Sequence, residues 1–369
     1  MNNQMGQVDV AIVGAGHNGL VAACYLAKAG LAVTIFEAAD QVGGAAISTE
    51  VFPGVPARLS KYSYLVSLLP EQIRRDLGME LTTVKRSVSS FTPDPQQPDR
   101  VLVIPADHES ELHQRITEFT GNEADAIAWI DFYTRTARVA KKVFPTLTQP
   151  LISRDQMRTL IDSEEDWNDF FERPLGEVIE KSISNDVLRG IILTDALIGT
   201  FANAHGDDKR ANICFLYHVI GNGTGDWDVP VGGMGQVTGQ LDAIARGLGV
   251  QISLSTPVSW IKPSEGRVIV GTPTGEVSAT RVLVNAAPAV LARLLGEPER
   301  EIPLPDGGAQ IKVTCWSNVF LGFAAAIRLK HSMEHFTSMK VMNSSNVLLQ
   351  SRSRANYQTH YLLKSIVTA

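Results

Sequence analysis

A glycine cluster that directly follows a short apolar segment is the strongest constraint on how this chain folds. Residues 8–13 form an apolar run of the kind that makes a buried strand. The pattern G-x-G-x-x-G follows at Gly14, Gly16 and Gly19, and residues 20–28 have the pattern of a helix. The order strand, glycine turn and helix predicts the first half of a dinucleotide-binding βαβ unit.

Each glycine of this turn has a separate mechanical role. Gly14 permits the tight turn out of the strand, Gly16 lets a pyrophosphate approach the backbone, and Gly19 lets the helix pack closely on the strand. The start of the helix adds unpaired N–H groups and the positive end of the helix dipole. We expect His17 to make only packing or weak phosphate contact. The phosphate-binding residues are therefore predicted to be Gly14, Ala15, Gly16, His17, Asn18 and Gly19.

An acid and a second glycine pair indicate which dinucleotide binds. Residues 33–36 form another apolar run, which ends at Glu37, eighteen positions after Gly19. This is close to the spacing of an acid that bonds ribose hydroxyls, and its charge would repel the 2′-phosphate of NADP. Gly43 and Gly44, followed by Ala45, favour FAD over NAD. Such a pair resembles the extended fingerprint of FAD enzymes related to glutathione reductase and the amine oxidases.

The composition excludes several classes of protein. With 369 residues, of which 44% are hydrophobic, the chain is long enough for two domains. A net charge of −6 gives no electrostatic footprint for nucleic acid or anionic membrane, and the apolar stretches are too short to span a bilayer. The first residues show no leader pattern, and the three cysteines form no C-x-x-C. We therefore expect a cytoplasmic protein without a metal site, a redox dithiol or a transmembrane segment.

The sequence pattern changes twice along the chain. Residues 109–197 are mainly helical in pattern, and we interpret the acids at 164–166 as a solvated helix face. From Gly221 the sequence becomes rich in glycine, and a helix with an apolar stripe follows at 237–248. Short strand-like runs then lie between 250 and 287. We expect the chain to leave the dinucleotide domain, build a helical domain and return to complete its first sheet.

Six segments spread along the chain share one further pattern. They are Gly14–Leu20, Val42–Ala46, Ser63–Leu69, Thr194–Gly199, Leu216–Val219 and Gly232–Gly235. Together these segments resemble the phytoene-desaturase-like FAD oxidoreductases. Within that group the chain looks most like the family of pyridine nucleotide-disulfide oxidoreductase domain-containing protein 2. The resemblance runs from about residue 8 to about residue 313.

This resemblance implies a fold and a cofactor. The fold would be α/β, with an FAD-binding Rossmann-like domain of the glutathione-reductase/amine-oxidase type and a second, discontinuous substrate domain. The fingerprint glycines, Glu37 and the turn at 43–45 would hold the ADP half of FAD. Val258, at the start of a strand, would meet the adenine through its backbone, and Gly233 and Met234 would lie near the flavin. Disulfide chemistry is not expected, because the necessary cysteine pair is missing.

Three residues are candidates for catalysis, and each has a structural alternative. The position of Lys312 resembles that of a strand lysine in flavin amine oxidases, where the ammonium group holds a water against flavin N5. The alternative is an exposed lysine at a strand end. His205 and His218 lie in segments expected near the flavin and could transfer protons near neutral pH. The alternative for both is a structural histidine.

The C-terminal segment differs from the rest of the chain. Residues 314–369 contain six Lys or Arg and a single acid, Glu334, and the resemblance ends just before them. We interpret this segment as an atypical tail, natural or aberrant, outside the packed core. The predicted domains are 1–60 with 225–290 for FAD, 61–224 with 291–313 for the substrate, and 314–369 for the tail. Family members continue with a longer C-terminal stretch that contacts the cofactor, so FAD retention stays open.

The sequence predicts an FAD-dependent oxidoreductase that removes hydride from a C–H bond of a small molecule, with a separate electron acceptor. The residues do not identify the substrate; the family resemblance implies a hydrophobic one. The alternative is a catalytically impaired protein that keeps the fold and acts through a protein partner. A homo-oligomer is a separate expectation. A third reading, an NAD-dependent dehydrogenase, is disfavoured by Gly43 and Gly44.

Overall fold

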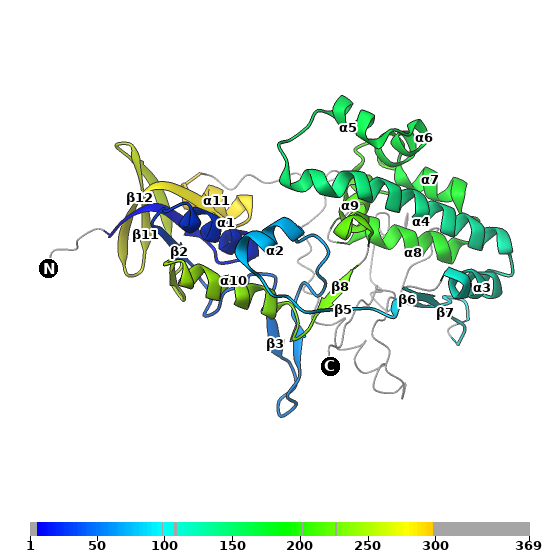
Figure 1. Ribbon diagram of the computed structural model, residues 1–369, viewed down its shortest axis with the longest axis horizontal. Coiled ribbons are helices and arrows are strands. Elements are labelled where there is room, and N and C mark those ends of the chain that lie inside the picture. The colour runs from blue at the N-terminus through cyan, green and yellow to red at the C-terminus, as the bar shows by residue number, and fades with distance from the viewer. Residues whose placement is uncertain are drawn as a thin grey trace, which may run out of the picture.

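The chain forms two lobes in a computed structural model that describes residues 6–297, except 98, 107–108, 199, 201 and 226. One lobe is built on a sheet and the other almost entirely from helices (Figure 1). Lys312 and the predicted tail at 314–369 lie outside the described residues. The predicted α/β class is confirmed by this arrangement of a mainly parallel central sheet with helices around it.

A six-stranded sheet in the order β10-β11-β12-β1-β2-β9 forms the first lobe. The strands β12, β1, β2 and β9 run parallel, whereas β10, β11 and β12 form an antiparallel meander. Strands from both ends of the described chain therefore meet in one sheet, as predicted. Their bounds are β1 (Gly6–Val13), β2 (Val33–Phe36), β9 (Gln251–Ser253), β10 (Trp260–Ser264), β11 (Arg267–Thr272) and β12 (Gly275–Val284).

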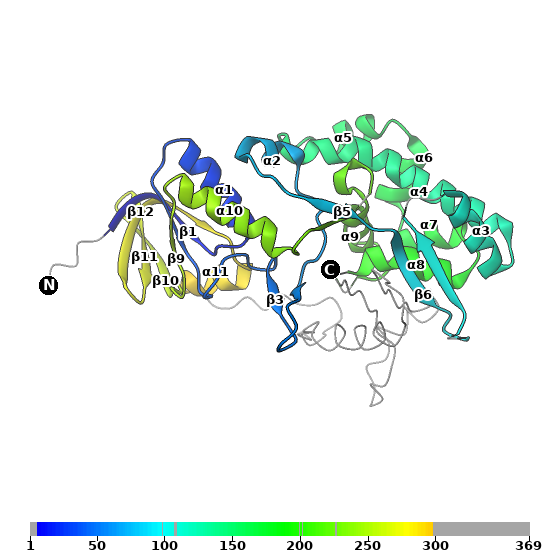
Figure 2. The same cartoon turned by 60° about the horizontal axis from the view of Figure 1, so that its bottom comes forward.

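Alternate residues of β1 supply two hydrophobic layers, as the two-residue period of a strand requires. Val10 and Ile12 pack with residues of α1 (His17–Lys28) and α10 (Gly235–Gly247). These two helices lie side by side on one face of the sheet (Figure 2). Ala11 and Val13 face the other layer, where Val13 packs with Leu294 of α11 (Pro288–Leu294).

The position of α11 differs from the predicted domain division. Residues 291–313 were expected in the substrate domain, but Leu294 is buried against Val13 and Ile261 of the sheet. The apolar face of this short helix covers the strand ends on the side opposite α1. Within the described residues, 288–294 therefore belong to the sheet lobe.

The second lobe is a helical bundle around one core. Its helix ends carry side-chain caps: Asn122 caps α4, Ser153 and Gln156 form a capping box at α5, and Asn185 caps α8. None of the described helices is both long and apolar enough to cross a membrane. The elements are β6 (Val88–Pro93), β7 (Val101–Pro105), α3 (Glu109–Thr120), α4 (Glu123–Val143), η1 (Phe144–Thr148), α5 (Arg154–Ile161), α6 (Glu164–Trp167), η2 (Asn168–Glu172), α7 (Leu175–Ser182), α8 (Asp186–Leu197), α9 (Arg210–Val219) and η3 (Gly221–Gly223).

The chain crosses twice between the lobes, and the two crossings pair with each other. On the outward path lie β3 (Ser48–Glu50), β4 (Arg58–Ser60), α2 (Glu71–Leu77) and β5 (Thr83–Lys85), and on the return path lies β8 (Asp228–Pro230). The strands β5 and β8 are antiparallel partners, and Val66 bridges to Asp228. The predicted boundary between the substrate domain and the FAD domain, at 224–225, therefore lies next to the paired strands that connect the two lobes.

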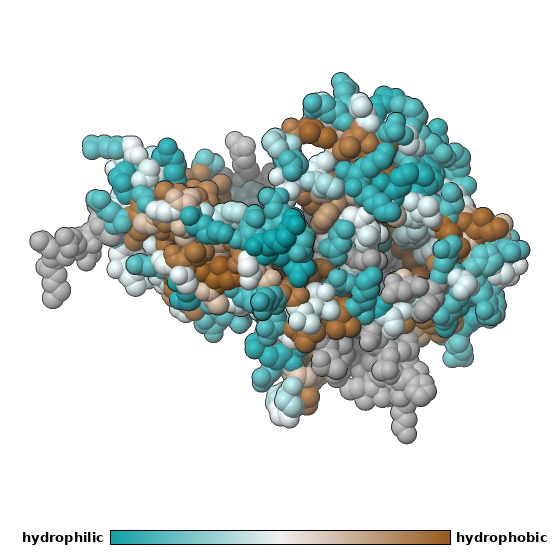
Figure 3. All heavy atoms as spheres, viewed as in Figure 1, coloured by the Kyte–Doolittle hydropathy of each residue, from teal (hydrophilic) through white to brown (hydrophobic). Residues whose placement is uncertain are grey.

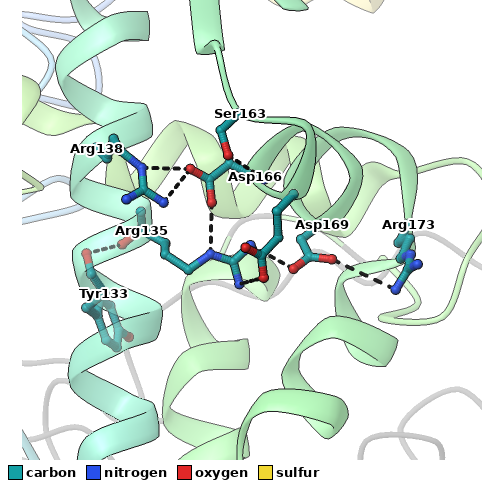
Figure 4. A network of polar contacts seen from close by, with 9 residues as sticks. Tyr133, Arg135, Arg138, Ser163, Asp166, Asp169 and Arg173 are labelled. Atoms are coloured by element: carbon teal, nitrogen blue, oxygen red, sulfur yellow. Dashed lines mark hydrogen bonds and ion pairs between the residues drawn. The ribbon is translucent and has the colours of Figure 1, made fainter.

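A buried charge network fastens α6 and η2 onto α4 (Figure 4). The guanidinium of Arg135 donates to Asp166 at 2.8 Å and to Asp169 at 2.7 Å, and Arg138 donates to the second oxygen of Asp166. The prediction that the acids at 164–166 form a solvated face is wrong for Asp166, which is 1% exposed. Its side chain turns inward because two arginines of α4 compensate its charge.

The outer surface of the helical lobe is largely polar. Figure 3 shows mostly hydrophilic residues over the visible face of α4 to α6, with some hydrophobic residues at the upper left of this lobe. Leu151 and Ile152, which precede α5, are exposed. A small exposed apolar group of this kind is common on globular proteins.

Candidate functional site

The glycine turn between β1 and α1 packs against Asn285, a residue that was not predicted to belong to the site. The backbone N–H of Asn285, just after β12, donates to Val13 O at 2.8 Å, and its side-chain amide donates to Gly14 O at 3.3 Å. Gly14 has a φ of +97°, and a Cβ there would lie 2.6 Å from Asn285 O. A Cβ on Gly19 would overlap Gly14 O and lie 2.9 Å from Asn285 Nδ2. Asn285 thus fills the space that the glycines leave.

Glu37 ends β2 and turns its carboxylate toward this loop. One carboxylate oxygen accepts a hydrogen bond from Ala15 N at 2.6 Å, and the other accepts from Ala39 N at 2.9 Å. The Glu37 backbone N–H donates to Ser253 O of β9. The acid is half-buried and is held at the edge where the parallel strands end, next to the glycine turn. This is the position that the sequence predicts for a ribose-binding acid.

The second glycine pair lies against the first. Gly43 N donates to Ala15 O at 2.9 Å, and Gly43 and Gly16 form an isolated parallel bridge. Gly44 has a φ of +59°, and a Cβ there would lie 3.1 Å from Gly16 Cα. Gly44 and Ala45 are exposed. The two glycine segments therefore form one backbone-lined surface at the start of α1.

The start of α1 meets the requirements of a bound pyrophosphate. Among the described residues, the N–H groups of Gly16 and Asn18 donate to no backbone or side-chain acceptor, as expected for a helix N-terminus. His17 and Asn18 are exposed beside them. Although much of the His17 side chain is exposed, neighbouring atoms remove part of the water around its ring, which lowers its pKa from the usual value. The open donors, the glycine surface and Glu37 together fit an adenine dinucleotide.

Gly233 and Met234 lie where α10 begins, packed under the β3–β4 ribbon. Met234 N donates to Ser60 Oγ at 3.1 Å, and the next backbone N–H, of Gly235, donates to Ser48 Oγ at 2.9 Å. Gly233 has a φ of +79° and is buried against Ser48. These hydroxyls satisfy the first N–H groups of α10, so the described contacts give this turn a structural role. A role near the flavin stays a proposal.

Val258 precedes a strand rather than starting one, because β10 begins at Trp260. Its side chain is half-buried between the sheet and α11. Within the described part of the chain, no hydrogen bond uses its backbone N–H or C=O. Those groups remain available for the predicted contact with adenine.

The two candidate histidines belong to the helical lobe and lie in different places. His205 Nε2 is 3.2 Å from Glu180 Oε1, and its ring packs on Gly176 of α7. His218, on α9, stacks on Trp227 at 5.4 Å between ring centroids. Its Nδ1 lies 2.8 Å from Cys214 O. The described contacts hold the His205 ring against Glu180 and Gly176, whereas His218 lines a cavity.

This cavity has a volume of about 280 Å³ and lies within the helical lobe. It is bounded by the β6–β7 ribbon, α4, α8, the end of α9 and the segment before β8. Its polar wall residues include Arg86, Ser90, Asp195 and His218, and its aromatic ones Trp129, Tyr133 and Trp227. Burial, and then the charge of Asp195, raise the pKa of Tyr133 well above its usual range, so the phenol stays protonated.

Comparison with known proteins gives relatives over most of the chain. An uncharacterized protein of Mycobacterium tuberculosis is 44% identical over 318 residues, which cover 83% of this chain and 58% of that protein. Pyridine nucleotide-disulfide oxidoreductase domain-containing protein 2 of Rattus norvegicus is 28% identical over 330 residues, covering 80% and 56%. The chain thus spans a little over half the length of these relatives.

Among solved structures, a putrescine oxidase variant shares the fold with a TM-score of 0.53 and 24% identity, covering 78% of this chain and 60% of that one. The predicted family resemblance is confirmed by these relatives. The sequence matches the family described as flavin containing amine oxidoreductase over residues 19–357. This match extends past residue 313, where the resemblance was expected to end. The chain belongs to the flavin containing amine oxidoreductase family.

Proposed function

We propose that this protein is an FAD-dependent oxidoreductase that removes hydride from a C–H bond of a small, hydrophobic molecule and passes the electrons to a separate acceptor. One observation carries the proposal: the glycine turn, the second glycine pair and Glu37 converge on one surface at the start of α1. The bound FAD would supply the redox chemistry. The chain's own residues would bind and orient it.

The proposed contacts follow from the donors and acceptors present. The N–H groups of Gly16 and Asn18 would donate to the pyrophosphate, and the carboxylate of Glu37 would accept from ribose hydroxyls. The backbone of Val258 would bond the adenine. Glu37 already accepts from Ala15 N and Ala39 N, which fixes its orientation before the ligand arrives.

Gly16 allows the proposal to be tested separately from folding. Its φ of −67° is allowed for alanine, and a Cβ would meet only the end of the Asn285 side chain, at 2.9 Å from Nδ2. We therefore expect Gly16→Ala to fold but to lose FAD, because its methyl group occupies the path of the pyrophosphate. Gly239→Ala in α10 is the matched control, since a Cβ there meets nothing within 4 Å.

The measurement is the visible absorption of flavin after purification, and after incubation with added FAD and gel filtration. Circular dichroism checks the fold of each variant. Flavin in the wild type and in Gly239→Ala, but not in Gly16→Ala, supports the proposal. A folded wild-type protein that neither carries nor takes up FAD would refute it, and would favour the non-catalytic alternative in which the protein acts through a partner.

A further inference from the structure

We propose that Asn285 is a positioning residue of the dinucleotide site: its side-chain amide donates to the glycine turn and holds it in the shape that binds the pyrophosphate. The inference rests on the FAD binding proposed above and adds to it a residue outside the glycine fingerprint. It makes one specific claim, that position 285 must carry a neutral hydrogen-bond donor and does more than fill space.

Asn285 reaches the turn because β12 and β1 are parallel neighbours. Val284 is paired with Val13 in their register, so Asn285 and Gly14 each follow the last paired residue of their strand. The N–H of Asn285 donates to Val13 O at 2.8 Å and continues the ladder by one bond. The side chain of Asn285 therefore starts from a fixed backbone, directly beside the turn.

The side-chain nitrogen of Asn285 lies close to all three fingerprint glycines. Nδ2 is 3.3 Å from Gly14 O, and it is 2.9 Å from the place that a Cβ would take on Gly16 and on Gly19. Because a carbonyl oxygen can only accept, the donor end of the amide faces Gly14. The positive end of a neutral dipole is therefore presented to the turn that is proposed to bind the negatively charged pyrophosphate.

The carbonyl of Gly14 depends on this side chain. Gly14 N and both peptide groups of Ala15 are held by the backbone of β2, by Glu37 and by the second glycine pair. Among the described residues, by contrast, Gly14 O accepts from the Asn285 amide alone. Glycine loses more conformational freedom on ordering than any other residue, so a contact that fixes the turn beforehand lowers the cost of binding.

A donor and a space filler make opposite predictions for aspartate at position 285. Asn285→Asp has nearly the same shape, so a residue that only fills space should tolerate it at every pH. A donor should not, because ionised aspartate sets a negative oxygen against Gly14 O and beside the pyrophosphate. Protonated aspartate, however, carries an O–H that can donate. The defect of this variant should therefore depend on pH.

The sign of that dependence follows from the surroundings. The ordinary pKa of aspartate is about 3.9, and partial burial, a carbonyl oxygen and a bound pyrophosphate all favour its neutral form and raise the pKa. Binding to the variant therefore takes up a proton, and its affinity rises as the pH falls. The charged and titratable groups on the adjoining segments are His17 of α1, Glu37 after β2, Asp40 before the second glycine pair and Arg293 of α11. Every variant keeps them, so the ratio to the wild type at each pH isolates position 285.

ADP is the probe, because the turn is proposed to hold the ADP half of FAD. Isothermal titration calorimetry of the full-length, flavin-free protein measures its affinity, and circular dichroism checks the fold. At pH 8 we expect Asn285→Asp to bind ADP roughly 10- to 150-fold more weakly than the wild type, the range of a hydrogen bond to a charged group. Asn285→Ala should lose roughly 2- to 12-fold, the range of a neutral one. At pH 5 the order of the two variants should reverse, since protonated aspartate regains the donor.

Asn185→Asp is the matched control, since it adds the same charge in the helical lobe. Asn185 caps α8 by accepting from Val187 N and Leu188 N, and aspartate caps a helix about as well as asparagine. Its affinity for ADP should equal that of the wild type at both pH values. Asn285→Ser keeps a donor and should bind ADP more tightly than Asn285→Ala at pH 8. This pair decides if the aspartate variant does not fold, and equal affinities would then overturn the proposal.

Three further results would overturn it: an Asn285→Asp protein that binds ADP like the wild type, a defect of the same size at pH 5 and pH 8, or no variant at position 285 that folds. Visible absorption measures FAD uptake separately. A wild type that binds ADP but not FAD would refute the oxidoreductase proposal and leave the test of Asn285 intact. A flavoprotein that gives one of the three results would do the reverse, and a wild type that binds neither nucleotide would refute both.

Discussion

Replacing Gly19 by alanine adds one methyl group in the first turn of α1, and we expect it to destabilise the fold even without any ligand. The added Cβ would overlap Gly14 O, lie 2.9 Å from Asn285 Nδ2 and lie 3.4 Å from Asn285 Cβ. Gly14 O belongs to the turn backbone and cannot rotate away. The helix and β1 would have to separate, which disturbs the packing around Leu20.

The magnitude is the difference between two effects. Inserting a methyl group into a packed interior costs about 1–3 kcal/mol, and the contact with a fixed carbonyl oxygen places Gly19 at the upper end. Alanine is better than glycine in a helix by about 1 kcal/mol, which offsets part of this. The net loss is about 2 kcal/mol, which lowers Tm by roughly 4–8 °C for an unfolding unit of 150–250 residues.

Gly239→Ala is the control, because we expect it to change Tm in the opposite direction. Gly239 lies in the middle of α10, and nothing lies within 4 Å of the place that its added methyl group would take, so only the helix propensity changes. Its Tm should rise, by an amount equivalent to about 0.5–1 kcal/mol. Thermal unfolding of the flavin-free proteins, followed by circular dichroism, gives both values. A Tm of Gly19→Ala at or above that of the wild type would refute the packing argument.

Further expectations concern the cofactor, the charge network and the thiols. Glu37→Gln should reduce the FAD retained after dialysis, because it replaces a charge-assisted bond worth about 1.5–3 kcal/mol; unchanged retention would contradict the ribose assignment. Arg135→Met should lower the free energy of unfolding by about 3–5 kcal/mol, since it leaves two buried aspartates without their shared partner, whereas Arg154→Met, at an exposed pair, should change it little. Burial raises the pKa of Cys24 and of Cys214 to about 11, so at pH 8 iodoacetamide should modify them only after unfolding, as peptide mapping by mass spectrometry would show.

The dinucleotide-binding unit was predictable because its residues are close together in the sequence and act mainly through their backbone. The strand, the turn and the helix over residues 8–28 are consecutive, and glycine marks the positions where a Cβ cannot fit. The predicted FAD agrees with the flavin of the family. Glu37 lies at the end of β2 because the strand length fixes its place.

The rest depended on contacts between distant segments. Asn285 fills the glycine turn from the other end of the described chain, and a lone asparagine after an apolar run does not indicate which turn it meets. Asp166 lies in a run of acids that looks solvated, and only the partners on α4 show that it is buried. The cavity is lined from several elements that no local pattern connects.

The close fit between Asn285 and the glycines of the first turn has a consequence for how this sequence can change over time. Gly14 and Gly19 are required by the protein's own backbone and by Asn285, whether or not a nucleotide is bound. Selection for folding alone would therefore preserve most of the fingerprint in a lineage that had lost its cofactor. The fold constrains Gly16 and Glu37 less strongly. Substitutions at these two positions, with the other glycines unchanged, would therefore indicate a related protein that has kept the fold and lost the cofactor.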